Sequence, residues 1–409
     1  MSNPNTLYLS YDGMTDALGQ SQVLPYLVGL SKHYNITLVS FEKKDNFEKN
    51  KNTIQQIVDA NNISWIPLNY TKQPPVLSTV YDVYRLKKIV FQLIKEKNIQ
   101  IIHCRSYITA LIGLQAKQQL GTKFIFDMRG FWADERVDGK LWNLKNPVFK
   151  KIYDYFKQKE IEFLQHADYT ISLTHNARNE ILSWKKFKNN PIKIQVIPCC
   201  VDMDLFNPNK IVEAEKTTWK SKLNISNDDL VLSYLGSVGT WYMLDEMMQF
   251  FVLFLKQYTN AKFLFINKDE KEKIIACATK HGVVDKIVVQ GANRNEVATI
   301  LSLSQLSVFF ILPAYSKKAS SPTKQGEIMA MQIPLVCNAN VGDTDFVVEK
   351  YNSGIIVDDF STMEQIIKKE LNRILQINDL AYLRVGAEDY FSLEKGIENY
   401  LKVYHTVLE

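Results

Sequence analysis

A serine, a lysine and a glutamate in the second half of this 409-residue chain have types and a spacing that could bind an anion and a pair of hydroxyl groups. Ser321 precedes Pro322, which predicts a helix with Ser321 as its N-cap and the proline as its first residue. A helix start directs backbone N–H groups and the positive end of the helix dipole toward an anion, and Lys324 adds a positive charge. Glu327, about one turn later, could accept hydrogen bonds from vicinal hydroxyls. The pattern favours a site for the diphosphate and ribose of a nucleotide. A capped surface helix with solvated charges is the alternative.

A second group of charged residues follows the apolar run that ends at Asp127. If that run is a strand of a parallel sheet, Asp127 lies at its carboxyl end, where such sheets bind their ligands. Arg129 could lower the pKa of Asp127 or bind an anionic acceptor. A structural cluster of ion pairs is the alternative interpretation of the same segment.

Two glycine-bearing turns also follow predicted strands. The segment 12–21 contains Gly19 and leads into a helix, which suits an anion near the helix start. An ordinary turn capped by Ser21 is the alternative. The segment that begins with Gly236, Ser237 and a second glycine, Gly239, would let a ligand approach the backbone closely.

Two isolated polar residues are further candidates. Arg294 opens a predicted helix after the apolar run 288–290 and could bind a phosphate, although a solvated surface arginine has the same signature. His103 lies near the end of a predicted strand and could face a ligand cleft. A core histidine with satisfied hydrogen bonds is the alternative.

Short apolar runs alternate with helical patterns along the chain, which is typical of parallel α/β units. This alternation would place the candidate residues at strand ends and helix starts. Helices are expected over Gln22–His33, Tyr81–Lys97 and Pro147–His166. Strands are expected over Thr6–Ser10, Ile36–Phe41, Ile63–Leu68, Ile99–Cys104, Lys123–Asp127, Asp168–Leu173 and Ile192–Ile197, and then over Leu230–Leu235, Lys262–Asn267, Lys286–Gln290, Leu306–Ile311, Ile333–Cys337 and Gly354–Val357.

The composition indicates an ordered globular protein of two domains. Apolar residues make up 46% of the chain, with 16 glycines and 12 prolines, too few for a fibrous or disordered protein. The longest apolar run, Met247–Leu255, is shorter than the roughly 20 residues of a membrane-spanning helix, and the polar first residues carry no secretory signal. None of the five cysteines has a metal-binding spacing. We expect a reduced, cytoplasmic protein without a metal site or cofactor.

The net charge of +5 conceals an asymmetry between the two halves. Residues 1–200 carry a net charge of +10, and the remainder carries −5. A basic first half suits a phosphate-bearing acceptor or the anionic headgroups at the inner face of the cytoplasmic membrane. Lysines that only solubilise exposed helices are the alternative. Nucleic acid is not favoured, because no recognised nucleic-acid-binding pattern accompanies the basic residues.

Together these segments resemble the retaining GT-B glycosyltransferases of family 4, the group that includes glycogen-synthase-like and mannosyltransferase-like enzymes. The resemblance spans nearly the whole chain. The segments that carry it are Asp12–Met14 with Leu18–Pro25, Phe126–Arg136, Val196–Pro198 with Val201, Asp202 and Phe206, Leu235–Tyr242, Ser321–Lys324 with Glu327, and Gly342–Asp343.

The resemblance implies an α/β fold of two doubly wound, Rossmann-like domains that face a central cleft. The first domain would comprise residues 1–200, joined by a closing helix over 392–409, and would bind the acceptor. The second, residues 201–391, would bind the sugar nucleotide. Glu327 matches the second glutamate of the family's E-x7-E motif, which binds the donor ribose, whereas the first glutamate is replaced by Ala319.

The family's usual basic pair after the first strand of the second domain is also absent from 236–245, so Lys324 and Arg294 are the candidate substitutes. Asp127 lies where relatives place a residue beside the reacting sugar. The candidate catalytic residues are therefore Asp127, Lys324 and Arg294; those for the donor are Gly19, Gly236, Ser237, Gly239, Ser321, Thr323, Lys324 and Glu327; those for the acceptor are Asp16, His103, Arg129, Trp132, Glu135 and Arg136.

The implied activity is the metal-independent transfer, with retention, of a hexose or N-acetylhexosamine from a UDP- or GDP-linked donor. A glycan or lipid-linked acceptor in cell-envelope polysaccharide synthesis would receive the sugar, and the basic first domain would contact the membrane peripherally. Two alternatives are a sugar-nucleotide epimerase and a catalytically weak or inactive homologue that acts as a partner subunit.

Overall fold

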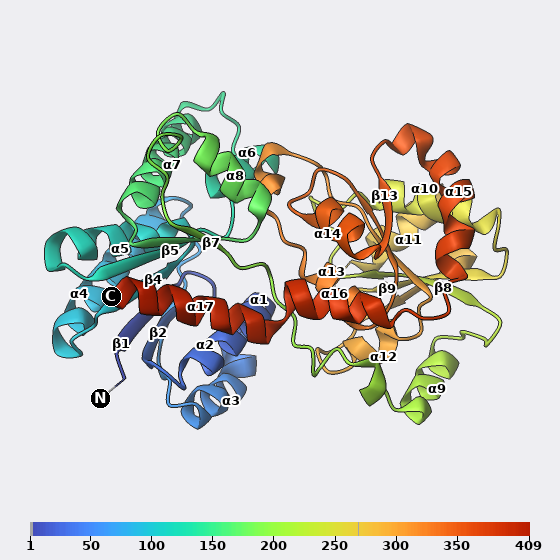
Figure 1. Cartoon of the computed structure of the whole chain (residues 1–409), viewed down its shortest axis with the longest axis horizontal. Helices are drawn as coiled ribbons and strands as arrows, with labels where there is room; N and C mark the ends of the chain where they lie inside the picture. The colour runs from blue at the N-terminus through green and yellow to red at the C-terminus, as the bar shows by residue number, and fades with distance from the viewer. Residues whose placement is uncertain (1–2, 269) are drawn as a thin grey trace. The chain divides into compact units, whose positions relative to one another are not determined.

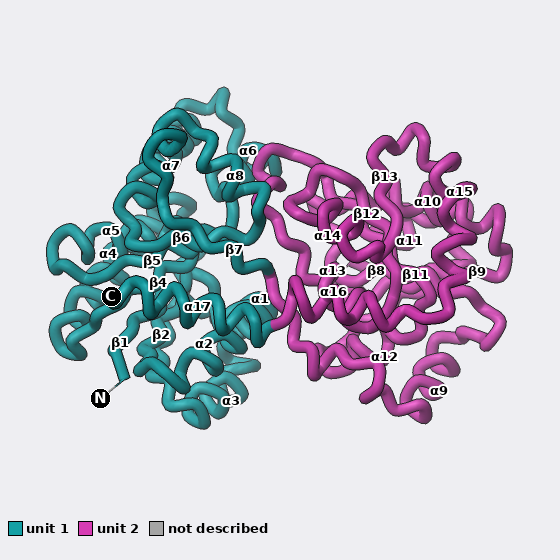
Figure 2. The backbone as a smooth tube through the Cα atoms, viewed as in Figure 1, with its two compact units in different colours: residues 1–198, 393–409 teal, residues 199–392 magenta. Residues whose placement is uncertain are grey.

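The computed structural model describes residues 3–268 and 270–409, which form two compact units (Figure 2). Unit 1 comprises residues 1–198 and 393–409, and unit 2 comprises residues 199–392. These bounds lie within two residues of the expected domain limits. Each unit is a parallel sheet with helices on both faces, so the expected class of two doubly wound domains is confirmed (Figure 1).

Unit 1 contains a seven-stranded parallel sheet of order β3-β2-β1-β4-β5-β6-β7. Every strand overlaps the run that predicted it. The strands are β1 (Asn5–Ser10), β2 (Asn35–Glu42), β3 (Ser64–Asn69), β4 (Ile101–Arg105), β5 (Lys123–Asp127), β6 (Tyr169–Ser172) and β7 (Ile194–Val196). The helices are α1 (Ala17–Gln22), α2 (Leu24–Leu30), α3 (Lys44–Ala60), α4 (Leu77–Glu96), α5 (Ser106–Leu120), α6 (Trp132–Asp138), α7 (Pro147–His166), α8 (His175–Ser183) and α17 (Leu393–Leu408).

Unit 2 contains a six-stranded parallel sheet of order β10-β9-β8-β11-β12-β13. The strands are β8 (Leu230–Leu235), β9 (Ala261–Ile266), β10 (Ile287–Gln290), β11 (Leu306–Phe309), β12 (Leu335–Asn338) and β13 (Gly354–Val357). The helices are α9 (Glu213–Lys222), α10 (Leu244–Leu255), α11 (Lys271–Lys280), α12 (Val297–Leu301), α13 (Thr323–Ala330), α14 (Thr344–Tyr351), α15 (Met363–Leu375) and α16 (Ala381–Phe391), and the 3-10 helices are η1 (Pro208–Lys210), η2 (Val284–Lys286), η3 (Tyr315–Ala319) and η4 (Phe360–Thr362).

The strands that carry candidate residues end in register. Ser10 of β1 pairs with Arg105 of β4, which pairs with Asp127 of β5. These strands are buried on both faces, so apolar residues fill their length and polar residues gather at their carboxyl ends. The register therefore brings the segments after β1, β4 and β5 to one edge of the sheet, as expected for ligand-binding loops.

The last helix, α17, belongs to unit 1, as expected for the closing helix, and packs on α2 (Figure 1). Gly29 makes the close approach feasible, because a Cβ there would lie 2.4 Å from Cδ1 of Ile397. The Tyr404 hydroxyl lies 2.7 Å from Nδ1 of His103, and the Tyr400 hydroxyl donates to Oδ2 of Asp127 at 3.0 Å. Buried polar contacts as well as apolar packing thus attach α17 to the sheet.

The chain differs from the sequence expectations mainly at helix ends. The helix expected over Gln22–His33 begins earlier, as α1 at Ala17, and is interrupted at Val23 before α2. Ser21 is not a cap, because it lies inside α1 and its hydroxyl donates to the Ala17 carbonyl at 2.8 Å.

The apolar runs of this chain are core elements. Among the described residues, no helix combines the length and the hydropathy that crossing a bilayer would require.

The attachment of α17 predicts that Tyr404→Phe destabilises the protein. The variant removes the hydroxyl that meets Nδ1 of fully buried His103, and an unsatisfied buried polar atom costs about 1–3 kcal/mol. We expect a melting temperature several degrees below wild type. Tyr84→Phe is the matched control, because Tyr84 is 67% exposed, and should melt like wild type. Equal melting of the two variants would contradict this account.

Candidate functional site

The start of α13 holds the lysine and the glutamate that the sequence singled out, but its cap differs from the expectation. The helix begins at Thr323 and Pro322 occupies the N-cap position, so the assignment of Ser321 as N-cap is wrong by one residue. The Ser321 hydroxyl instead accepts a hydrogen bond from the backbone N–H of Cys199 at 3.0 Å. Ser321 therefore fixes the segment before α13, and the N–H groups of its first turn begin at Thr323.

Lys324 is buried in an aromatic box. Its Nζ donates to the Tyr234 hydroxyl at 3.0 Å and lies 3.9 Å from the ring centre of Tyr242. Only 7% of the residue is exposed. The faces of aromatic rings attract a cation, so the box stabilises the ammonium form. Tyr234 comes from β8, which means that the strand before the glycine turn builds the lysine's surroundings.

Burial lowers the pKa of Lys324 from its ordinary 10.5 to about 7, against the opposing effect of the Glu327 carboxylate. A lysine with such a pKa changes its charge near neutral pH. An anion placed beside Nζ would favour the ammonium form and would gain a strong, desolvated partner. The site is therefore suited to an anion that has no bound metal ion, because Lys324 supplies the positive charge.

Gly236 supplies the space beside this lysine. Its φ of +112° lies in a region that L side chains rarely adopt, and a Cβ there would come 3.1 Å from Nζ of Lys324. The amide of Asn267 holds the turn by donating to the Gly236 carbonyl at 2.9 Å. Two further residues of this turn were expected to bind the sugar nucleotide. The Ser237 carbonyl accepts a hydrogen bond from the Tyr234 hydroxyl, and a Cβ on Gly239 would touch only Glu270. Gly236 is thus the turn residue that shapes the space at the lysine.

Glu327 and Arg294 meet each other directly. Nη1 of Arg294 donates to Oε1 of Glu327 at 2.5 Å, and its guanidinium lies over the ring of Phe206 at 4.7 Å from the ring centre. Glu327 is 4% exposed, whereas the Arg294 side chain is 43% exposed. Arg294 therefore has the expected ribose-binding carboxylate as its partner instead of the expected phosphate. Ala319, at the position of the other motif glutamate, is buried in η3.

In unit 1 the structure buries two of the expected contact residues. His103 is fully buried and Asp127 is 1% exposed. Nε2 of His103 lies 3.3 Å from Oδ2 of Asp127, and its other nitrogen meets Tyr404. The structure therefore buries both side chains, whereas we expected His103 to contact the acceptor and Asp127 to lie beside the reacting sugar. His103 is the core histidine that the alternative described.

The Asp127 carboxylate is nevertheless ionised and positions Arg129. Burial alone would raise its pKa, but the charge of Arg129 and the hydrogen bond with His103 hold the pKa below its usual value. Nη1 of Arg129 lies 3.7 Å from Oδ1 of Asp127. Burial lowers the pKa of His103, so its ring is neutral and donates through Nε2 to the carboxylate. Asp127 thus acts on Arg129, which extends to the surface of a cavity.

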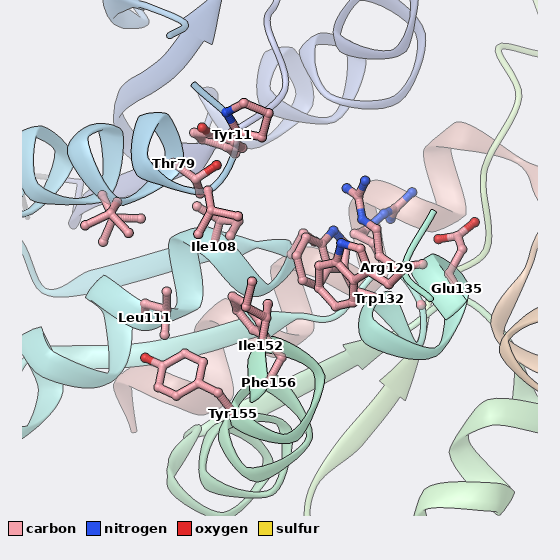
Figure 3. A pocket seen from close by; sticks show the side chains of 18 of the residues that line it. Tyr11, Thr79, Ile108, Leu111, Arg129, Trp132, Glu135, Ile152, Tyr155 and Phe156 are labelled. Carbon is pink, nitrogen blue, oxygen red and sulfur yellow. The ribbon is translucent and has the colours of Figure 1, made fainter. Parts of the chain in front are cut away.

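The remaining acceptor candidates from 129 to 136 line this cavity, which lies within unit 1 and has a volume of about 840 Å³ (Figure 3). Arg129, Trp132, Glu135 and Arg136 are all in its wall. The guanidinium of Arg136 lies 4.7 Å from the ring centre of Trp132. The structure therefore brings these four candidates together at one surface.

Asp16 and Gly19 do not line the cavity, and the structure gives each a local role. The Asp16 carboxylate accepts from Lys43 at 2.6 Å and from Asn46 at 2.5 Å. A Cβ on Gly19 would lie 2.2 Å from the Gly13 carbonyl oxygen, so a glycine is required there by backbone packing.

Sequence reasoning missed the residues that build the surroundings of both sites. Tyr234 and Tyr242 flank the glycine turn of unit 2, and Arg105 ends β4 in the cavity wall of unit 1. The signal for Arg105 was its place at the carboxyl end of a predicted strand. Nothing in the local pattern distinguishes the two tyrosines from core residues.

One group of described side chains could hold a metal, although the sequence led us to expect none. Ligand atoms of Asp245, Cys277 and His281 lie within 4.8 Å of one another. The Asp245 carboxylate already accepts from Lys280 at 2.6 Å and from His281 at 2.9 Å. These partners lower the Asp245 pKa to about 2. The lysine beside the carboxylate makes an ion-pair cluster the better description.

Comparison with known families gives two matches that together cover most of the chain. The model of "Glycosyltransferase Family 4" matches residues 27–205. The model of "Glycosyl transferases group 1" matches residues 215–382. The first match falls almost entirely on unit 1, and the second lies within unit 2.

Individual relatives are distant. An alpha-monoglucosyldiacylglycerol synthase of Acholeplasma laidlawii is 22% identical in an alignment of 243 positions that covers 56% of this chain and only 55% of the relative. Sucrose-phosphate synthase of Thermosynechococcus elongatus matches with a TM-score of 0.74 at 14% identity, over 98% of both chains. Anabaena HepE, solved with UDP and glucose, matches with a TM-score of 0.68 at 9% identity, over 98% of this chain and 99% of that one. At such identities the structural matches establish the fold.

The burial of Lys324 predicts that the protein's stability depends on pH. In the unfolded chain the lysine has its ordinary pKa of 10.5, and in the folded chain about 7, so between these values the unfolded state binds more protons. Stability must therefore rise with pH across this window. Relative to Lys324→Met, which lacks the group, wild type should gain on the order of a few kcal/mol between pH 7 and pH 10. Melting temperatures of both proteins test this, and parallel curves would contradict it.

Proposed function

Because the chain belongs to the family 4 glycosyltransferases of group 1, we propose that it transfers a hexose or N-acetylhexosamine from a UDP- or GDP-linked donor to a glycan or lipid-linked acceptor. Transfer proceeds with retention of the anomeric configuration and without a metal ion. Unit 2 binds the donor and unit 1 binds the acceptor. The observation that carries the proposal is the buried Lys324 at the start of α13, beside the side-chain-free turn at Gly236.

The donor's two charged phosphates suit this corner of unit 2. A diphosphate beside Gly236 lies next to the Lys324 ammonium and faces the first N–H groups of α13. Glu327 then accepts from the ribose hydroxyls, with Arg294 orienting its carboxylate. The UDP and glucose bound by Anabaena HepE support a donor of this class.

The chemistry requires stabilisation of a leaving group more than a covalent catalyst. The bond between the anomeric carbon and the donor phosphate oxygen breaks, and negative charge develops on the nucleoside diphosphate. Lys324 and the helix N–H groups are fixed before the reaction and stabilise that charge. The acceptor oxygen bonds to the anomeric carbon from the same face, and its proton passes to the leaving phosphate.

A thermal-shift screen with UDP, GDP, ADP, CMP and their sugar conjugates tests the donor site. A ligand that binds only the folded protein stabilises it, by about 2.7 kcal/mol at a hundredfold excess over Kd, and therefore raises its melting temperature. We expect UDP or GDP and its sugar conjugate to stabilise the protein, and Lys324→Ala to lose that effect. Lys369→Ala is the control, because Lys369 has a side chain that is 83% exposed.

The transfer itself is tested with the donor so identified. The product's anomeric coupling in NMR should match the donor's, turnover should survive EDTA, and Glu327→Ala should reduce both turnover and nucleotide binding. Stabilisation by no nucleotide would overturn the donor site, and an inverted product would overturn retention.

The pKa of Lys324 makes nucleotide affinity dependent on pH. The diphosphate binds the ammonium form, and the free protein loses that proton above about pH 7. The Kd for the nucleoside diphosphate should therefore increase with pH above 7, by up to about tenfold per pH unit. Isothermal titration between pH 7 and 9 measures this, with proton uptake on binding. A Lys324→Gln protein should bind weakly at every pH, and an unchanged wild-type Kd would refute the role of the lysine's proton.

A further inference from the structure

The cavity of unit 1 has one apolar end and one cationic end. Its wall is formed by α4, α5, α6 and α7, by the end of β4, and by the segments that follow β1, β3 and β5. Figure 3 shows Leu111 and Tyr155 at one end, and Arg129 and Glu135 at the other. Val80, Ile108 and Ile152 are also in the wall, whereas Asp12, Arg105 and Arg129 lie at or just after strand ends.

The cationic end is built for an anion. Arg105, Arg129, Arg136 and Lys151 line the cavity, against two acidic residues, Asp12 and Glu135. Arg105 is 4% exposed, and its Nη1 donates to Asp12 at 3.1 Å.

The Nε of Arg105 is buried and has no hydrogen-bond partner within the described chain. The small exposed part of Arg105 borders the cavity, and the positive charge of its guanidinium favours an anion bound beside Arg129 and Arg136.

The apolar end is unsuited to a sugar. A glycan placed against Val80, Ile108, Leu111 and Ile152 would bury hydroxyl groups without partners, which is unfavourable. A hydrocarbon chain in the same place gains free energy with each buried methylene. The volume of about 840 Å³ lies within the range of about 300–1,000 Å³ of small-molecule sites.

The backbone around the cavity is held in costly conformations. Val76, Ser106 and Arg129 line it with φ values of 69°, 70° and 58°. A positive φ is unfavourable for residues other than glycine, and most of all for a β-branched one. Such strain is concentrated at ligand sites, where the surrounding structure maintains it. Val76 and Val80 are also 40% and 61% exposed, so the apolar surface continues outside the cavity.

We infer that this cavity binds an amphiphilic acceptor, with a phosphate-type anion at Arg105, Arg129 and Arg136 and a hydrocarbon chain along α4, α5 and α7. This inference rests on the proposed function, because it identifies the chemical class of the acceptor that unit 1 receives. The anion lies at the carboxyl ends of β4 and β5, and the chain lies between the helices and leaves over the exposed face of α4.

Binding of butyl, octyl and dodecyl phosphate, each below its critical micelle concentration, tests the inference. Trp132 and Trp142 line the cavity, so tryptophan fluorescence reports binding. Each methylene that enters the cavity should strengthen binding up to about fourfold. Octyl phosphate should therefore bind at least tenfold more tightly than butyl phosphate, and inorganic phosphate at least a hundredfold more weakly than octyl phosphate.

Variants separate the two ends. Arg105→Gln should weaken octyl phosphate at least tenfold and leave 1-octanol unchanged, and Leu111→Trp should fill the apolar end and remove the dependence on chain length. Val80→Asp should weaken dodecyl phosphate. Val385→Asp is its matched control, because Val385 is a helical valine that is 63% exposed and lies in unit 2.

The same preparations are screened with nucleotides, which separates the two proposals. Nucleotide stabilisation without chain-length-dependent binding of alkyl phosphates overturns the amphiphile inference and leaves the proposed function intact. Alkyl phosphate binding without any nucleotide response overturns the proposed function. Equal affinity for inorganic and dodecyl phosphate, or binding only to phosphatidylglycerol vesicles and not to monomeric alkyl phosphates, would also refute the inference.

Discussion

The buried carboxylate of Asp127 is the constraint on which unit 1 depends. An ionised group with 1% exposure costs several kcal/mol unless partners surround it, and here they come from β4, from α17 and from the segment after β5. His103 and Tyr400 satisfy one oxygen, and Arg129 lies beside the other. The charge that attaches the last helix to the sheet therefore also positions a cavity arginine. The end of the chain and the ligand-binding edge of the sheet are stabilised as one network.

Unit 2 places a buried cation where unit 1 places a buried anion. Lys324 has aromatic faces and a hydroxyl instead of a carboxylate against Nζ, so its charge is only partly compensated. A carboxylate beside Nζ would have kept Lys324 in its ammonium form, and a bound anion would then have added little electrostatic stabilisation. Partial compensation keeps the pKa near neutrality and reserves the strongest interaction for an incoming anion. The adjacent pair of Arg294 and Glu327 is already neutral, which leaves the lysine as the electrostatic focus of this helix start.

The sequence predicted every strand of both sheets, because buried parallel strands are short apolar runs that stand out between helical patterns. It also located the segments after β5 and before α13. It could not show the distant partners on which the burial of a side chain depends: Tyr400 lies 273 residues from Asp127, and Tyr404 lies 301 residues from His103. Tyr234 and Arg105 were missed for the same reason. Ser321 was predicted as the N-cap but lies one residue before it, because a serine followed by proline is compatible with both positions.

The lysines and the arginines of the first half of the chain lie in different places in the structure. The first 200 residues contain 22 lysines but only five arginines, and three of those arginines line a single cavity, with one lysine beside them. Arginine keeps its charge when buried and presents a planar fork of N–H groups that matches a phosphate, whereas lysine is strongly hydrated and favours the surface. A chain that needed only solubility would not concentrate its rarer basic residue at the end of two buried strands. The lysines thus account for most of the net charge, and three of the arginines mark where we propose that an anion binds.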